Sequence, residues 1–283
     1  MSKSIIFDTE TTGLDSEDRI IQVGAIIVDS KDKEYSDLHN ELCSCEVPIK
    51  IEAMATHGIR ESQLVGEGKF EDSRFFKVLK ELNNESNYLI AHNLDFDLGM
   101  LTKYNFENKF SLIDTLQCAK HLFEINDIVG DYKVSNHKLQ TFRYMLLTEE
   151  DEANEADKYG VEIKAHDAIG DVVILKLFLK KLVERLMSKY KLKKYSEIME
   201  KLVFLTKEPV EVKFINFGKH KGKAITEIES IDSGWINWLF KEQEKQKNSN
   251  DSKFNRELYN TLDKVIKKRN SQTGHSAGDG LQF

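Results

Sequence analysis

The first residues whose types suggest chemistry are two carboxylates at the end of a short apolar run. In SIIFDTETTGL, residues 4–14, Asp8 and Glu10 directly follow the run IIF, which is typical of a buried strand. Residues two apart on a strand project to the same face, with α-carbons about 7 Å apart. Two carboxylates placed in this way repel each other unless a cation lies between them. The alternative explanation for the two acids is that the strand simply ends at the surface, where acidic residues are common.

A second group of polar residues follows the apolar run LIA at residues 89–91. His92 and Asn93 come next, and Asp97 lies near the start of a predicted helix. Asp95 and Asp97 are two apart, so on a helix they face different directions and only one is expected to point into a site. The helix dipole offers another reason for either acid, because it favours carboxylates in the first turn.

The segment AHDAIGDVVILKLF, residues 165–178, combines a histidine with an acid in an apolar stretch. If His166 and Asp171 were both helical, the five-residue spacing would place them about 140° apart. They converge only if His166 lies on the loop before the helix. Asp171 then lies one turn into the helix on the face of Leu175 and Phe178, where a carboxylate is costly unless it is paired or bound to metal.

These segments together supply oxygen ligands and one imidazole, with no cysteine ligand. Carboxylates favour Mg²⁺ or Mn²⁺, whereas Zn²⁺ favours Cys or several His. We therefore expect two ions about 3.5–4 Å apart that activate a water and stabilise the leaving oxygen of a phosphodiester. His166 is suited to take the proton from that water. The expected metal ligands are Asp8, Glu10, Asp171 and one of Asp95 and Asp97.

The segments FDTETTG, AHNLDFD and HDAIGD resemble, in this order, the three exonuclease motifs of the DEDDh (DnaQ-like) family. That family includes the proofreading subunit of bacterial DNA polymerase III and ribonuclease T. The resemblance spans residues 4–186 and includes IEAMATHGI at 51–59. It implies an RNase H-like fold, 3′→5′ removal of mononucleotides, and His166 as general base. It also implies Asp8, Glu10, Asp97 and Asp171 as metal ligands. All five positions are filled, whereas a non-catalytic binding module would be expected to lack at least one.

The resemblance also implies that five further residues line the path of the terminal nucleotide: Thr11, Thr12, Gly13, His57 and Asn93. Turn formation explains Thr12 and Gly13 equally well, and a hydrogen bond to the backbone explains Asn93. Asp114 matches a family position that supports the site without binding metal. Asp95 occupies a position that the family leaves variable.

A second region resembles the small domain that follows the nuclease in bacterial proteins similar to exodeoxyribonuclease X. Its segment INFGKHKGKAITEI predicts a tight hairpin, and DSGWINWLF predicts a short helix. The resemblance implies DNA as substrate and a role in repair or mismatch excision. One interpretation is a phosphate-and-stacking surface formed by Lys219, His220, Lys221 and Lys223 with Phe214, Phe217 and Trp235. The favoured alternative for Trp235 and Trp238 is a small core with both rings packed inward.

The periodicity of the chain predicts an α/β fold, an RNase H-like mixed sheet flanked by helices, with a small C-terminal α+β domain. Strands are expected at residues 4–8 and 20–28 and within 34–47, and a long helix from Asp167 to about Lys189. The acidic stretch 148–160 is expected to be an exposed loop. The predicted divisions are a nuclease domain at 1–190, a basic linker at 191–204, a small nucleic-acid-binding domain at 205–268 and a disordered tail at 269–283.

The net charge of −7 is unevenly distributed. Residues 1–200 hold 26 Lys and Arg against 37 Asp and Glu, whereas the window 176–223 holds 14 against 5. Local charge governs docking to phosphates more than the total charge of the protein does. The alternative explanation is that these lysines only keep exposed helix faces solvated. Three cysteines without metal-type spacing indicate reduced thiols. With no signal peptide and no membrane-spanning run in view, the expected compartment is the cytoplasm.

The sequence therefore predicts a two-metal 3′→5′ exonuclease that uses Mg²⁺, or Mn²⁺ in its place. It would act on DNA, at single-stranded 3′ ends, and release nucleoside 5′-monophosphates. One alternative is an RNA-processing exoribonuclease, because no motif reveals contacts to a ribose 2′-hydroxyl. Another is a polymerase-associated proofreading subunit, although the sequence shows no segment that would have to attach the protein to a polymerase. Repair or replication proteins are the expected partners, and no membrane association is expected.

Overall fold

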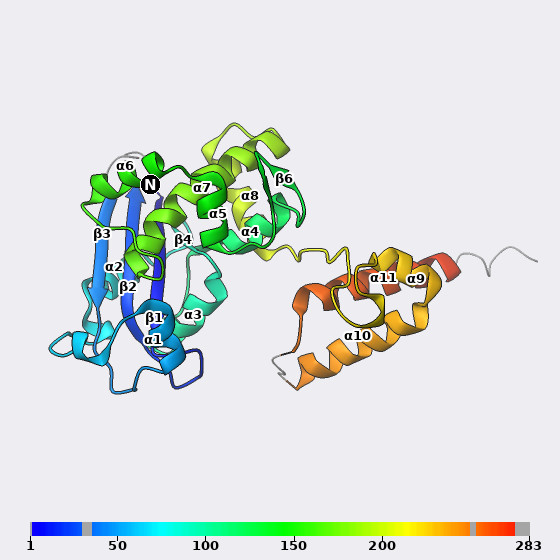
Figure 1. The fold of residues 1–283 in the computed structure, drawn as a ribbon, viewed down its shortest axis with the longest axis horizontal. Coiled ribbons are helices and arrows are strands. Elements are labelled where there is room, and N and C mark those ends of the chain that lie inside the picture. The colour runs from blue at the N-terminus through cyan, green and yellow to red at the C-terminus, as the bar shows by residue number, and fades with distance from the viewer. Residues whose placement is uncertain (1, 30–35, 250–252, 275–283) are drawn as a thin grey trace, which may run out of the picture. The chain divides into compact units, whose positions relative to one another are not determined.

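The structure, a computed structural model, describes residues 2–29, 36–249 and 253–274. The chain divides into two compact units, Met1–Lys207 and Glu208–Phe283 (Figure 1). The first unit contains all three segments with the predicted catalytic residues. The second contains the Gly-Lys-His-Lys-Gly turn and both tryptophans.

A five-stranded mixed sheet forms the centre of the first unit. Its strands, in the spatial order β3-β2-β1-β4-β5, are β1 (Lys3–Thr11), β2 (Ile20–Asp29), β3 (Ser36–Leu42), β4 (Tyr88–Ala91) and β5 (Ser111–Asp114). β2 pairs antiparallel with both β1 and β3, while β4 runs parallel to β1 and to β5. The sheet confirms the predicted mixed α/β fold, including the third strand expected within residues 34–47.

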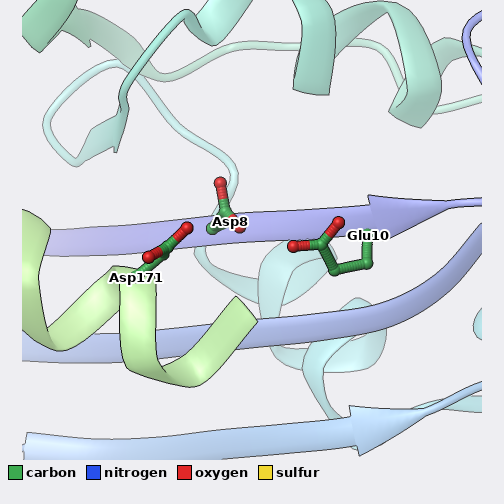
Figure 2. Close-up of side chains that lie close together, drawn as sticks. All are labelled: Asp8, Glu10 and Asp171. Atoms are coloured by element: carbon green, nitrogen blue, oxygen red, sulfur yellow. The ribbon is translucent and has the colours of Figure 1, made fainter. Parts of the chain in front are cut away.

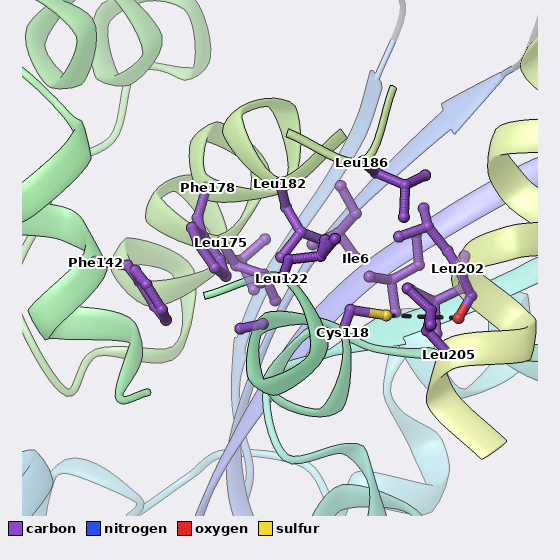
Figure 3. Packing of buried hydrophobic residues seen from close by; sticks show 14 of the residues in the cluster. Ile6, Cys118, Leu122, Phe142, Leu175, Phe178, Leu182, Leu186, Leu202 and Leu205 are labelled. Carbon is purple, nitrogen blue, oxygen red and sulfur yellow. Dashed lines mark hydrogen bonds between the residues drawn. The ribbon is translucent and has the colours of Figure 1, made fainter. Parts of the chain in front are cut away.

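Helices cover both faces of this sheet because successive side chains of its central strands point to opposite sides. Ile5 and Phe7 of β1 pack with residues of α2 (Arg74–Leu82) and α3 (Leu94–Thr102). Ile6 packs on the opposite face with residues of α4 (Thr115–Leu122), α5 (Leu139–Leu146) and α7 (Ala168–Tyr190), as Figure 3 shows. Apolar residues on both faces are what a strand buried between two helical layers requires.

Shorter elements complete the first unit. They are α1 (Ile51–His57), the 3₁₀ turns η1 (Glu61–Gln63) and η2 (Phe70–Asp72), and the small antiparallel pair β6 (Ile128–Val129) and β7 (Tyr132–Lys133). The three cysteines are free. None of the helices in the described part of the chain is long and apolar enough to cross a membrane.

The acidic stretch 148–160 forms a helix, α6 (Glu149–Tyr159), so the predicted exposed loop is wrong. Thr148 and Asp151 form a capping box, and the acids of the first turn lie at the positive end of the helix dipole. Two ion pairs connect α6 to α5 and α7, namely Glu152 with Arg143 and Glu155 with Lys176. The prediction treated the charges as solvated and overlooked both the cap and these basic partners.

The predicted basic linker at residues 191–204 is also wrong, because helix α8 (Tyr195–Lys207) occupies most of it. Its buried residues, Ile198, Met199, Leu202 and Leu205, belong to the same core as Ile6 (Figure 3). The hydroxyl of Thr206 accepts a hydrogen bond from the backbone N–H of Asp114 at 2.9 Å. The nuclease unit therefore extends to Lys207, and the abundant lysines concealed an apolar face at helical spacing.

The second unit is helical over most of its described residues. It contains η3 (Gly218–His220), α9 (Ile225–Ile231), α10 (Ser233–Asn248) and α11 (Arg256–Gly274). The predicted hairpin is present as backbone hydrogen bonds, from Ile215 N–H to Lys223 O and from Ile225 N–H to Lys213 O, with one bridge between Phe214 and Ala224. The described residues of this unit thus form helices and a single bridge in place of the expected strands.

Helix α11 also changes the end of the predicted domain. It continues to Gly274, so residues 269–274 of the predicted disordered tail are helical. Leu258 and Leu262 are buried in the core of the second unit, and Val265 and Ile266 pack against it at helical spacing. The remainder of the predicted tail, 275–283, lies outside the described residues.

Leu202→Ala is expected to lower the free energy of unfolding by about 2–5 kcal/mol, because it leaves a cavity where α8 meets the sheet core. The matched control is Phe204→Ala on the exposed side of the same helix, where the ring is 50% exposed. This control should change the free energy by less than about 1 kcal/mol. Urea denaturation of the full chain measures both, and equally small effects would contradict the placement of α8 in the core.

Candidate active site

Asp8 and Glu10 lie on the same face of β1, as their spacing predicts (Figure 2). In the ladder with β2, Asp8 is opposite Gly24 and Glu10 is opposite Gln22. The register shifts between Glu10 and Thr11, so regular pairing ends directly after the second acid. Both carboxylates are therefore carried by a hydrogen-bonded strand, which holds them more rigidly than a loop would.

The first turn of α7 brings Asp171 to the same face. Gly24 allows this approach, because a β-carbon there would lie 2.4 Å from the backbone carbonyl carbon of Ala168. Asp167 caps the helix, as the sequence predicts. The side chain of Gln22 donates a hydrogen bond to Asp167 at 2.7 Å and accepts one from the N–H of Ala168 at 3.3 Å. Strand β2 therefore fixes the start of α7, and with it Asp171, beside β1.

Asp8, Glu10 and Asp171 each place a carboxylate oxygen within 4.8 Å of the other two. Burial raises the pKa of Asp8 well above its ordinary value, and the negative charges of Asp97 and Glu10 raise it further. Burial and neighbouring acids raise the pKa of Glu10 to about 8, and burial raises the pKa of Asp171 to about 6. The cluster can therefore carry its full negative charge at neutral pH only when cations compensate it.

Asp97 lies next to this cluster but outside the group of three. Its side chain is buried, and it accepts a hydrogen bond from the hydroxyl of Thr9 at 2.7 Å. Burial raises the pKa of Asp97 to about 7, while the bond from Thr9 opposes that rise. Asp97 in turn raises the pKa of Asp8 and Glu10. Asp95 is exposed, so only one of the two acids points inward, as expected.

Two residues that the sequence did not single out contact or neighbour Asp171. Gln140 of α5 donates through Nε2 to Asp171 Oδ1 at 2.6 Å. Arg143, one turn later, lies near enough for its charge to lower the pKa of Asp171 against the effect of burial. Arg143 also forms hydrogen bonds of 2.9 and 2.5 Å with Glu152 of α6. No motif marks these residues, and their three-residue spacing on one helix face was the only signal.

His166 lies in the turn before α7, as its convergence with Asp171 requires. Its φ of 59° is uncommon for a residue with a side chain. This turn packs closely onto the helix, because a β-carbon on Gly170 would lie 2.5 Å from the carbonyl oxygen of Lys164. The exposed His166 ring lies near Asp171, where its protonated form partly offsets the effect of burial on the carboxyl pKa.

The residues after β1 have well-defined structural contacts. The hydroxyl of Thr12 is buried and donates to Asp18 at 2.9 Å, and the hydroxyl of Thr11 donates to the carbonyl oxygen of Gly13 at 2.7 Å. A β-carbon on Gly13 would lie 2.5 Å from Asp18 Oδ2. These contacts agree with turn formation for Thr12 and Gly13, and the role of Thr11, Thr12 and Gly13 in substrate binding stays a prediction.

His57 and Asn93 are positioned by neighbouring backbone. His57 Nδ1 accepts the N–H of Ile59 at 3.0 Å, so the proton lies on Nε2 and is donated to the carbonyl oxygen of Thr11 at 3.2 Å. Burial lowers the pKa of His57, and nearby His166 lowers it further. Asn93 has a φ of 77°, an exposed side chain and an N–H that donates to Asp114 at 3.1 Å. Their contacts with substrate stay predictions.

The donor set at this site fits a divalent cation that prefers oxygen ligands. The group of three carboxylates comes from β1 and α7, Asp97 of α3 lies beside it, and no thiol is in the group. Such a set suits Mg²⁺ or Mn²⁺ better than Zn²⁺. Within residues 2–29, 36–249 and 253–274, no other group of three potential metal ligands lies so close together.

In EDTA, Glu10→Gln is expected to raise the melting temperature at pH 8 and to leave it almost unchanged near pH 4.5. The folded-state pKa of Glu10, about 8, lies above its ordinary 4.5, so the folded protein loses stability as pH rises between these values. Glutamine removes that penalty. Thermal unfolding across this pH range measures it, with Glu81→Gln on an exposed position of α2 as control. A shift of the melting temperature that is the same at all pH values would contradict the raised pKa of Glu10.

Comparison with known proteins matches both units. A family model described as exonuclease matches residues 5–178, and a model described as exodeoxyribonuclease X-like C-terminal matches residues 215–244. Exodeoxyribonuclease 10 of Escherichia coli (strain K12) is 25% identical over 235 residues, which are 83% of this chain and 89% of that protein.

Two further proteins resemble part of the chain. DNA polymerase III subunit epsilon of Rickettsia prowazekii is 30% identical over 152 residues, 47% of this chain and 64% of that protein. The crystal structure of E. coli exonuclease I in complex with a dT13 oligonucleotide has a TM-score of 0.51 at 19% identity, covering 68% of this chain and 43% of that one. Because the exonuclease model spans more than half of the chain, the protein belongs to the exonuclease family and is a nuclease hydrolase.

Proposed function

We propose that this protein is a metal-dependent 3′→5′ exonuclease that releases nucleoside 5′-monophosphates from DNA 3′ ends. The observation that carries this proposal is the convergence of Asp8, Glu10 and Asp171 to within 4.8 Å, with Asp97 beside them. Carboxylates whose pKa values are raised by burial and repulsion are poised to bind cations at neutral pH. Excision during DNA repair or mismatch correction is the proposed setting.

The four carboxylates would hold two Mg²⁺ ions, which Mn²⁺ can replace. When bound, the ions supply Lewis-acid chemistry, lowering the pKa of a water and neutralising charge on the phosphodiester. Asp8 and Glu10 contribute ligands from a rigid strand, and Asp171 contributes one from the first turn of α7. Thr9 orients Asp97 from one side, as Gln140 orients Asp171 from another.

His166 is the proposed general base. Its ring is exposed and lies near Asp171, so an unprotonated ring nitrogen is open to accept the proton of the attacking water. The carboxylate of Asp171 would then stabilise the imidazolium. His57 donates from Nε2 to a backbone oxygen in the structure, which leaves His166 as the imidazole suited to this proton transfer.

DNA as the substrate is supported by the relative that aligns over most of both chains. Exodeoxyribonuclease 10 is matched over 89% of its length, and the second unit of this chain also resembles a model named for an exodeoxyribonuclease. An RNA substrate is an outcome of the same assay. The assay uses oligonucleotides of DNA and RNA that are labelled at the 3′ or the 5′ end. The protein digests them in the presence of Mg²⁺, Mn²⁺ or EDTA, and the products identify both the polarity of digestion and the preferred sugar.

Asp97→Asn is expected to lower the rate of 3′-label release from DNA by roughly 100-fold or more. Removing a metal ligand should reduce the rate more than removing a residue that only orients a ligand, which typically costs about 10–100-fold. Asp95→Asn is the matched control, since it makes the same chemical change at an exposed position two residues away. It should keep the wild-type rate. Wild-type activity in Asp97→Asn, or activity that persists in EDTA, would refute the assignment of the metal ligands.

Gln140→Leu should lower the rate by about 10–100-fold and raise the Mg²⁺ concentration needed for half-maximal rate, because Asp171 loses the amide that orients it. The second readout separates positioning from a general loss of stability. Tyr144→Ala, at a residue of α5 that is 71% exposed, is the control. An unchanged Mg²⁺ requirement in Gln140→Leu would show that Gln140 does not position Asp171.

A further inference from the structure

Three aromatic rings form a continuous run on the second unit. The ring centroids of Phe217 and Trp235 are 6.3 Å apart, and those of Trp235 and Trp238 are 6.2 Å apart. Phe217 is 40% exposed and Trp238 is 55% exposed. The inward packing favoured from the sequence is therefore wrong for Trp238, whereas Trp235 is half-buried against the core.

The run is rigid because the middle ring is fixed from several sides. Trp235 packs against the core of the second unit, and the ring of His220 meets it edge-on at 4.8 Å. Asp232 caps α10 by accepting the N–H of Trp235 at 3.1 Å and also contacts His220 Nε2 at 3.0 Å. Phe217 and Trp238 thus flank a ring that cannot move freely, which lowers the entropy cost of binding a ligand against them.

Lysines lie close in sequence to these rings, together with one acid on the same side of α10, Glu242, which follows Trp238 by four residues. The segment 213–223 contains four lysines and no Asp or Glu. Lys219 and Lys221 are exposed beside Phe217 in sequence, although Lys219 also pairs with Asp232 at 2.7 Å. On α10, Lys241 and Lys245 follow Trp238 by three and seven residues, which places them along the same side of the helix.

We propose that this aromatic surface, formed by Phe217, Trp235 and Trp238 with Lys219, Lys221, Lys241 and Lys245, binds a single strand of DNA on the second unit. Exposed rings stack on bases of any sequence, and flanking lysines contact the phosphates. A purely apolar partner would cover the exposed Lys221, Lys241 and Lys245 without compensating their charge, so charge complementarity favours a polyanion with flat apolar groups. The choice of DNA rests on the proposed function, while the stacking and phosphate contacts rest on the second unit alone.

The test measures binding of the full chain to a 5′-fluorescein oligothymidylate by fluorescence anisotropy in EDTA, so that no hydrolysis occurs. Trp238→Ala should weaken binding at least about five-fold, since stacking contributes roughly 1–3 kcal/mol per base. Trp238→Phe should restore most of the affinity because it keeps a ring. Lys221→Ala should reduce the slope of log affinity against log salt by about 0.7, the value for one phosphate contact on a single strand.

Lys267→Ala, at a position of α11 whose side chain is 75% exposed, is the control and should bind like the wild type. With Mg²⁺, hydrolysis of the p-nitrophenyl ester of thymidine 5′-monophosphate reports the active site alone and should be unchanged in Trp238→Ala. Failure of the wild type to hydrolyse this ester would count against the proposed function only. Wild-type affinity in Trp238→Ala would overturn the DNA surface. Sedimentation in which the wild type self-associates and Trp238→Ala does not would also overturn it, because the rings would then form an interface between copies of this chain.

Discussion

Three carboxylates whose oxygens lie within 4.8 Å of one another repel in any fold, so the surrounding structure must oppose that repulsion. Here the opposition comes from regular secondary structure. β1 is paired on both sides, with β2 and with β4, and α7 is capped and packed against β1 and β2. Such a scaffold holds the acids close together, where burial and repulsion raise their pKa values. Bound cations would relieve this cost, so stability lost at the site would be converted into affinity for metal.

The start of α7 is where most of these constraints meet. Gly24 lets the helix backbone approach the sheet, and Gln22 ties β2 to the helix cap through Asp167. From the other side, Gln140 of α5 holds Asp171, and Arg143 connects the same region to α6. The acidic helix α6 therefore contributes to the site indirectly, through an arginine that also moderates the charge of Asp171. A region that resembles a solvated acidic loop in sequence is part of the support of the active site.

The placement of the proposed catalytic residues could be predicted because it depends on local rules. Alternation places Asp8 and Glu10 on one side of a strand, and the helical period forces His166 out of the helix if it is to meet Asp171. The outer partners could not be predicted, since Gln140 and Gln22 reach the site only through tertiary packing. The same limit explains the error over α8, which was grouped with the lysines at 191–194 although its apolar face packs against β5 and α4, far away in the sequence. Trp238 was misassigned because an exposed ring and a core ring have the same helical spacing, and only the structure separates them.

The charge distribution gives the two proposed sites different tasks. Residues 1–200 hold 26 basic and 37 acidic residues, so the net charge of the nuclease unit opposes the approach of a polyanion over long range. Metal ions in the proposed site would offset this at one point, close to the scissile phosphate, but not along the strand. Rings and lysines on a covalently attached second unit would raise the local concentration of DNA at the active site, and the gain depends on the connecting chain as well as on affinity. In this arrangement the second unit would change KM on long strands and leave the chemical step unaltered, because the proposed metal ligands and the proposed general base all belong to the first unit.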